Sequence, residues 1–207
     1  MLRQAQHGRG LEAAADWPDR VRLPFAFDVP QMVADLAVLE QSDWTAHFVT
    51  QNYAGAWDVL PLRAQAGAVH PVMMIYSDPG VSDWVDTPFL DAAPYLREVI
   101  AAFQCPIEAV RLMRLSPGSS IHEHRDHDLD AAEGRARIHV PVTTNSHVSF
   151  LLNGLPVTML PGEAWYLRLA DAHAVHNGGT SDRVHLVIDA VVDQWLAGTI
   201  AAGSLLS

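Results

Sequence analysis

The chain has 207 residues, of which 49% are hydrophobic, and this supports one well-filled hydrophobic core rather than two. Its formal net charge of −11 disfavours binding to the phosphate backbone of nucleic acids. All 13 basic residues are Arg, which excludes lysine Schiff-base chemistry and the lysine of a P-loop.

A single cysteine, Cys105, rules out a disulfide within the chain and a zinc site built on several cysteines. A reducing, cytoplasmic location fits this composition. The sequence before residue 23 resembles neither a signal peptide nor a membrane anchor. No apolar stretch approaches the roughly 18 residues that a spanning helix needs. We therefore expect no nucleic-acid or membrane partner, and the oligomeric state stays open.

The first half of the chain is predicted to be helical. Residues 1–22 are rich in Ala, Arg and Asp and are expected to form a loosely ordered lead-in to a single domain over 23–207. Within 23–105, one helix is predicted from Pro30 to Gln41, where apolar residues recur at helical spacing. A second is predicted to begin at Thr87-Pro88 and to run to Gln104, because Thr suits the N-cap and Pro the first helical position.

The second half, about 106–192, is predicted to be a β-core. Short β-rich runs alternate there with turn signals such as Asn153-Gly154 and Pro161-Gly162. The runs are Val110–Leu115, Arg135–Thr143, Val148–Leu152, Val157–Leu160, Ala164–Leu169 and Arg183–Val192, with a closing helix over Gln194–Ala201. Many short strands at this spacing indicate an antiparallel sandwich or barrel. The expected fold is mainly β with N-terminal helices.

Ligand-type side chains are concentrated in the segment 122–128 of this β-core. In an extended chain, residues i and i+2 point to the same face, so His124 and Asp126 can converge on one ion. One more histidine from a distant strand would complete a 2-His-1-carboxylate triad, the arrangement typical of non-haem Fe(II) oxygenases. A solvated loop without a metal is the alternative, since a His-x-Asp pair recurs often by chance.

The segment 171–177 offers two candidates for the distant ligand, His173 and His176. They are separated by an odd number of residues and therefore face opposite ways in a strand. The residues alone leave this choice open.

Arg183 opens the final predicted strand. A buried Arg in a β-core is costly unless it meets an anion. The distal carboxylate of 2-oxoglutarate, a co-substrate of Fe(II) oxygenases, would be such an anion, and Arg can bind it through two parallel hydrogen bonds. The alternatives are pairing with Asp182 or a position on a solvated edge.

Four segments in a fixed order carry a family resemblance. They are Leu115-Ser-Pro-Gly-Ser-Ser-Ile-His-Glu-His124-Arg-Asp126, Arg137-Ile-His139-Val-Pro-Val, Pro161-Gly-Glu-Ala-Trp-Tyr, and the run from His173-Ala-Val-His-Asn to Arg183 and Asp189. Together they resemble the aspartyl/asparaginyl β-hydroxylase family, to which bacterial free-proline hydroxylases are related.

The resemblance implies a double-stranded β-helix, also called a jelly roll or cupin-like fold, that uses Fe(II), 2-oxoglutarate and dioxygen. In the family's H-x-V-x-N segment the first histidine is the ligand, which implies His173, and the 2-oxoglutarate Arg follows ten residues later, which implies Arg183. Arg137 and His139 match a strand pair that lies near the co-substrate or substrate in the family. The implied metal ligands, and hence the catalytic residues, are His124, Asp126 and His173.

The carboxylate ligand bears on the substrate. Vertebrate-type Asp/Asn β-hydroxylases lack it, whereas this sequence keeps Asp126 as free-amino-acid hydroxylases do, which favours an amino acid or a similar small molecule. One alternative is an Asp/Asn β-hydroxylase that acts on a protein or peptide. Another is a non-catalytic cupin-like protein that binds a metal and a carboxylate.

Four further residues are candidates for substrate contact. Trp165 lies in a predicted strand, and His185 shares a strand face with Arg183, although a hydrogen-bonded core histidine is an equal alternative. Arg111 and Arg114 are an odd number of residues apart on the strand before the metal segment, so at most one points inward. The inward one is expected to hold the carboxylate of an amino-acid substrate.

Overall fold

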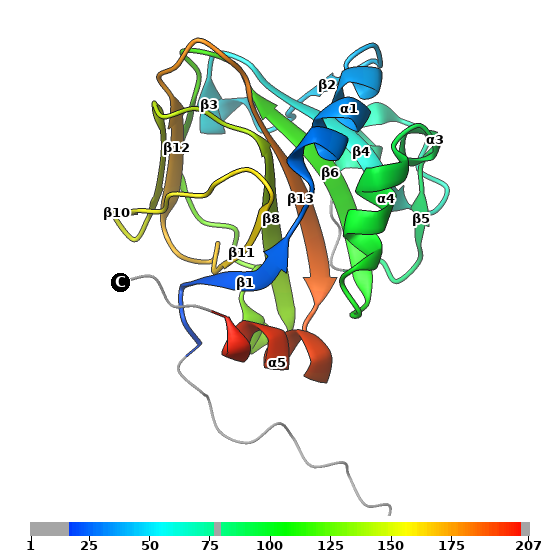
Figure 1. Ribbon diagram of the computed structural model, residues 1–207, viewed down its shortest axis with the longest axis vertical. Coiled ribbons are helices and arrows are strands. Elements are labelled where there is room, and N and C mark those ends of the chain that lie inside the picture. Colours follow the sequence, from blue (N-terminus) through cyan, green and yellow to red (C-terminus); the bar gives the residue numbers. More distant parts are fainter. Residues whose placement is uncertain (1–16, 77–79, 204–207) are drawn as a thin grey trace, which may run out of the picture.

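The computed structural model describes residues 17–76 and 80–203 as two facing antiparallel sheets, with helices on the outer side of the larger one (Figure 1). The major sheet has the strand order β1-β11-β8-β13-β6-β4-β2, and β5 pairs with β4. Its strands are β1 (Arg20–Ala26), β11 (Glu163–Leu167), β8 (Arg135–Thr143), β13 (Arg183–Val191), β6 (Ile107–Leu115), β4 (Trp57–Gln65), β2 (Thr45–Ala46) and β5 (Trp84–Asp86).

The minor sheet has the order β10-β9-β12-β7-β3. Its strands are β10 (Leu155–Pro156), β9 (Val148–Leu152), β12 (His173–Asn177), β7 (Ser120–His124) and β3 (Tyr53–Ala54). From β6 to β13 the chain alternates between the sheets, because β6, β8, β11 and β13 belong to the major sheet, and β7, the β9–β10 hairpin and β12 belong to the minor one. This alternation is that of a double-stranded β-helix, so the predicted jelly-roll fold is confirmed.

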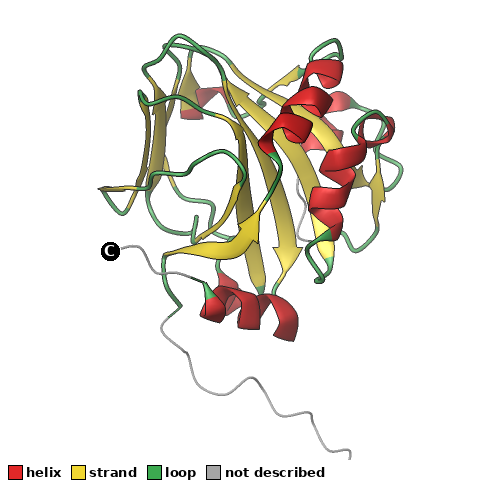
Figure 2. Ribbon diagram, in the orientation of Figure 1, coloured by secondary structure: helices red, strands yellow, loops and turns green. Residues whose placement is uncertain are grey.

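The helices gather mainly on the outer face of the major sheet (Figure 2). They are α1 (Val29–Leu39), α2 (Pro71–Ile75), α3 (Pro88–Asp91), α4 (Pro94–Ala101) and α5 (Gln194–Ala202), with 3-10 turns at η1 (Thr50–Asn52) and η2 (Ala131–Glu133). Asp28 caps α1 by accepting a hydrogen bond from the Gln31 N–H at 3.0 Å. Met32, Leu36 and Leu39 are buried, as the helical spacing predicts.

Two hydrophobic clusters flank the major sheet, and β13 contributes to both. Val184, Leu186 and Ile188 belong to the cluster under the helices, whereas Val187 belongs to the cluster between the sheets. The polar residues of β13 share the face of Val187, because side chains alternate along a strand. The side chains of Arg183, His185 and Asp189 therefore point into the space between the two sheets.

The prediction that the first half of the chain is helical was wrong in part, because this half also supplies strands to the major sheet. Trp57–Gln65 forms β4, and Arg20–Arg22, predicted to belong to the lead-in, begin β1 and pair with β11. The rest of that lead-in, residues 1–16, lies outside the described residues. Strand β4 is largely buried, so its apolar run lacks the alternation that identifies a half-exposed strand.

Two further predictions need correction. The helix expected from Thr87 to Gln104 is two helices, α3 and α4, because Pro94 has no N–H to continue the first one. The Thr87 hydroxyl does not cap α3 and donates to the Pro61 carbonyl at 2.7 Å instead. The run Val157–Leu160, predicted as a strand, forms no strand and follows the short β10.

Candidate metal centre

His124 and His173 face each other across the paired strands β7 and β12. Each ring is held by a backbone carbonyl two residues earlier: His124 Nδ1 lies 2.8 Å from the His122 oxygen and His173 Nδ1 lies 3.0 Å from the Asp171 oxygen. A carbonyl only accepts, so the proton of each neutral ring is on Nδ1 and the Nε2 lone pair is free. Both rings are thus preset to bind a metal through Nε2.

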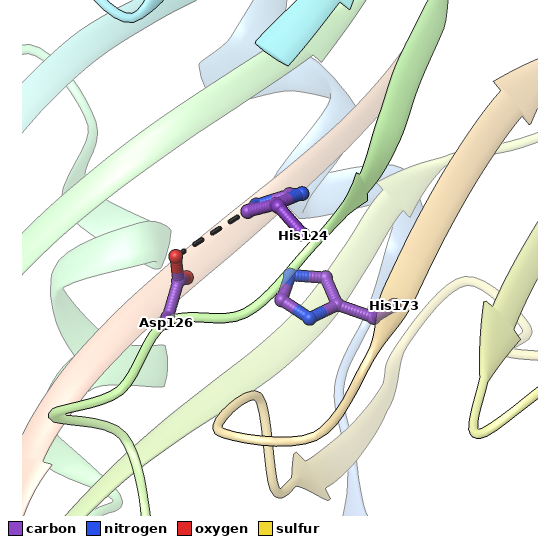
Figure 3. Close-up of side chains that lie close together, drawn as sticks. All are labelled: His124, Asp126 and His173. Atoms are coloured by element: carbon purple, nitrogen blue, oxygen red, sulfur yellow. Dashed lines mark ion pairs between the residues drawn. The ribbon is translucent and has the colours of Figure 1, made fainter.

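Asp126 completes the group from the loop after β7 (Figure 3). Its N–H donates to the Leu169 carbonyl at 2.8 Å, which fixes the loop beside the strand end. One ligand atom from each of His124, Asp126 and His173 lies within 4.8 Å of the others.

This donor set fits a cation. The distance from His124 Nε2 to Asp126 Oδ1 is 3.7 Å, too long for a hydrogen bond, and both atoms present lone pairs to the space between them. Two histidines and one carboxylate on one side of a site are the set that holds Fe(II) and leaves three positions open.

His176 does not reach this group. Its side chain is exposed on the other face of β12, and its Nδ1 lies 2.8 Å from the Ser120 hydroxyl. The geometry therefore brings together His173, and not His176, with His124 and Asp126.

A cavity of about 210 Å³ opens beside the triad. Its wall includes His124 and Asp126, the arginines Arg111 and Arg137, and the acidic residues Glu108 and Asp128. Aromatic residues from the N-terminal half also line the cavity, namely His47, Phe48, Trp57 and Tyr76. Among the described residues, the cavity wall does not include Trp165, whose indole N–H donates to Glu163 at 2.9 Å, nor Arg114 or His185.

Of the two arginines of β6, only Arg111 points inward. It is buried, donates to the Ile75 carbonyl at 3.3 Å and forms an ion pair with Asp189. Arg114 lies on the outer face, where it pairs with Asp58 at 3.1 Å and stacks over Trp44 at 4.4 Å. This arrangement agrees with the expectation that at most one of Arg111 and Arg114 faces the interior.

Arg183 is 3% exposed, and no carboxylate pairs with it within the part of the chain that the structure describes. Its Nη2 donates to His185 Nδ1 at 3.0 Å, while its Nε has no partner among those residues. Burial lowers the pKa of the guanidinium to about 9. A buried cation in this state requires an anion, so Arg183 is a candidate anion site.

The phenyl ring of Phe150 lies between Arg183 and the triad residue His173 and is near both. The Arg183 Cζ lies 5.9 Å from the Phe150 centroid, and the Phe150 ring stacks on His173 with centroids 6.3 Å apart. His139 stands beside the same ring at 6.0 Å, and its Nε2 has no partner in the described ranges. Burial, first, and the charge of Arg183 lower the pKa of His139 and His185 well below the usual value, so both rings are neutral.

His47 is a cavity residue that was not among the predicted site residues. It stacks on Trp57 with centroids 3.7 Å apart and planes 4° apart. Its Nδ1 accepts from the Val49 N–H at 3.3 Å, so a neutral His47 carries its proton on Nε2. Burial, followed by the charges of Arg111 and Arg137, lowers the pKa of His47 to about 4. The aromatic stretch around Trp44 and Trp57 was the available signal, but its place over the site depends on tertiary structure.

A family model described as aspartyl/asparaginyl beta-hydroxylase matches residues 28–192, which is most of the chain. The chain belongs to this family. The match includes every strand except β1 and all three residues of the triad, and membership makes the chain an enzyme of the hydroxylase kind.

Solved structures support the same fold for this family member. One is a 2OG-Fe(II) oxygenase-family oxidoreductase from Burkholderia pseudomallei, with 16% identity, a TM-score of 0.53, and coverage of 83% of this chain and 85% of that one. Another is a Pseudomonas putida prolyl-4-hydroxylase, with 12% identity, a TM-score of 0.51, and coverage of 84% and 93%. Within residues 17–76 and 80–203, no helix is long and apolar enough to cross a membrane.

Proposed function

We propose that this chain is an Fe(II)- and 2-oxoglutarate-dependent dioxygenase that hydroxylates a free amino acid or an amino-acid-like small molecule. The observation that carries the proposal is the juxtaposition of the triad with Arg183, a buried guanidinium that lacks a carboxylate among the described residues and is joined to His173 through Phe150. A metal that keeps open positions and a nearby cation together suit a dicarboxylic 2-oxo acid.

In this proposal, His124, Asp126 and His173 hold the metal, and Arg183 binds the distal carboxylate of 2-oxoglutarate. His139 lies near this co-substrate site as a neutral ring, and its Nε2, which lacks a partner in the described part of the chain, is available to a ligand. His185 accepts a hydrogen bond from Arg183 and so orients the guanidinium. Bound iron, with 2-oxoglutarate and dioxygen, supplies the oxidising chemistry and yields succinate and CO2.

The protein's own contribution is placement and exclusion of water. The Nδ1 hydrogen bonds of His124 and His173 fix their rings, and Asp126 is tied to Leu169 through its backbone. The apolar cluster between the sheets surrounds Phe150, so the charge of Arg183 acts in a medium of low polarity. Interactions with a co-substrate carboxylate are correspondingly stronger than in water.

The cavity beside the triad supports an amino acid as substrate. Its volume suits a small molecule, and its wall carries both signs of charge, since it includes Arg111, Arg137 and Asp128. A zwitterion would place its carboxylate toward Arg111, whose Nε has no partner among the described residues. We propose that the Nε2–H of His47, stacked on Trp57, provides a second, uncharged donor to the substrate.

A second candidate keeps the same chemistry and changes the substrate. The family description names aspartyl and asparaginyl β-hydroxylation, so a side chain in a peptide is the alternative to a free amino acid.

The proposal is tested by measuring succinate release with Fe(II), 2-oxoglutarate and ascorbate over a panel of free amino acids, with proline, aspartate and asparagine first, and over Asp- and Asn-containing peptides. We expect one free amino acid to stimulate succinate release and to gain the mass of one oxygen. Stimulation by peptides alone would favour the second candidate. No succinate under any condition, from protein that binds Fe(II), would support a metal-binding protein without this activity.

A further inference from the structure

Arg137 was expected near the co-substrate or substrate, but its guanidinium is engaged by two carboxylates of the protein. Its Nε and Nη2 donate to Asp189 Oδ1 and Oδ2 at 2.6 and 2.9 Å. Its Nη1 donates to Asp126 Oδ2 at 2.9 Å. Arg137 and Asp189 are directly opposite each other on β8 and β13, so the sheet register itself brings them together.

The contact with Asp189 determines where Arg137 can donate next. A guanidinium is planar, and its five N–H groups have fixed directions. Because Asp189 is 1% exposed and binds two of the nitrogens side by side, the third nitrogen is aimed at one place. That place is Asp126 Oδ2.

The two oxygens of Asp126 are thereby given different surroundings. Oδ2 accepts from Arg137, whereas Oδ1 faces the free Nε2 of His124 at 3.7 Å. Because Oδ2 is bonded to Arg137, Oδ1 is the oxygen that remains for a metal ion beside His124 and His173.

We propose that Arg137 is a positioning residue that makes Asp126 a one-oxygen metal ligand. This inference rests on the proposed function. An octahedral ion held by three protein atoms keeps three positions, which is the number needed for the two donor atoms of 2-oxoglutarate and for dioxygen. A carboxylate bound through both oxygens would leave only two, so the hydrogen bond from Arg137 preserves the position for dioxygen.

Arg111 provides a matched control for this role. Like Arg137, it is buried and pairs with Asp189, but no hydrogen bond joins it to Asp126 among the described residues. The variants Arg137→Lys and Arg111→Lys both keep the positive charge and both lose a guanidinium partner of Asp189. Only the first removes the donor to Asp126 Oδ2.

The test is an anaerobic titration of each variant with Co(II), whose visible absorption reports coordination number. We expect the wild-type protein to bind one Co(II), and His124→Ala and Asp126→Ala to lose it. Arg137→Lys should weaken Co(II) binding by about 10- to 100-fold and change the absorption spectrum, as loss of an outer hydrogen-bond partner does at metal sites. Arg111→Lys should stay within about twofold of wild type.

Equal affinities and spectra for Arg137→Lys and Arg111→Lys would overturn the inference while leaving the metal site intact. Failure of the wild-type protein to bind Co(II), or equal binding by Asp126→Ala, would instead overturn the metal site and with it the proposed function. If Arg137→Lys does not fold, a crystal structure of the Co(II)-loaded wild-type protein decides the question. One metal–oxygen contact from Asp126, with Arg137 on the other oxygen, would support the inference, and two contacts would refute it.

Discussion

His173 on β12 lies directly opposite His124 on β7, and the centroids of their rings are 4.2 Å apart. His176, three residues further along β12, is directed to the opposite face and bonds Ser120. The period of a strand therefore separates two histidines that stand almost side by side in the sequence.

Replacing His173 by Ala should abolish turnover and lower the affinity for Fe(II) by more than about 100-fold, because the change removes a ligand rather than an outer partner. His176→Ala should leave both properties unchanged, since this side chain is exposed and directed away from the triad. Anaerobic iron titration together with succinate release checks both variants. An active His173→Ala enzyme alongside an inactive His176→Ala enzyme would reverse the assignment.

Replacing Arg183 by Met should raise the apparent KM for 2-oxoglutarate by about 10- to 100-fold, because hydrogen bonds to a charged group contribute about 1.5–3 kcal/mol. In the wild-type protein, saturating 2-oxoglutarate should raise Tm, since a ligand that binds only the folded state stabilises it. The variant should lose that increase at the same concentration. An unchanged KM, measured by succinate release, would mean that the distal carboxylate binds elsewhere.

Replacing Arg111 by Gln should raise the KM for the amino acid that stimulates the most succinate release, by about 10-fold or more, as expected for loss of one charged contact. The KM for 2-oxoglutarate should change little. Arg114→Gln is the matched control, because Arg114 lies on the same strand but pairs with Asp58 on the outer face. A larger effect of Arg114→Gln than of Arg111→Gln would contradict the placement of the substrate.

The metal-free protein should lose stability as the pH falls below about 6.5. Burial lowers the pKa of His47 to about 4 and lowers the pKa of His139 and His185 well below the usual value. Histidines of the unfolded chain take up protons near pH 6.5, so between that pH and about 4 the unfolded state binds more protons and is favoured. Each such histidine lowers the free energy of unfolding by at most about 1.4 kcal/mol per pH unit.

Urea unfolding at pH 7.5, 6.5 and 5.5 measures this dependence. His47→Phe keeps an aromatic ring against Trp57 and removes one titrating group, so its stability should fall less steeply with pH than that of the wild-type protein. Equal slopes for the two proteins would show that His47 takes up a proton as readily in the folded state as in the unfolded state.

Features that depend on local pattern could be predicted from the amino-acid sequence. The strand over Arg135–Thr143 and the closing helix at Gln194 are found where alternation and helix signals predict them. The i, i+2 spacing predicted that His124 and Asp126 lie close together, although Asp126 belongs to the loop after β7 and not to the strand itself. Turn signals predicted the β-core.

Tertiary structure decided what depends on pairing between distant strands. The register of β8, β13 and β6 sets Asp189 between Arg137 and Arg111, and no periodicity within one strand contains that information. The pairing of β4 with β6 was likewise not predictable, because an apolar run does not specify its partner strand. His47 lines the cavity only because the tertiary fold brings its segment beside the triad. Local sequence fixes the direction of a side chain relative to its own strand, whereas the position of that strand depends on burial summed over the whole chain.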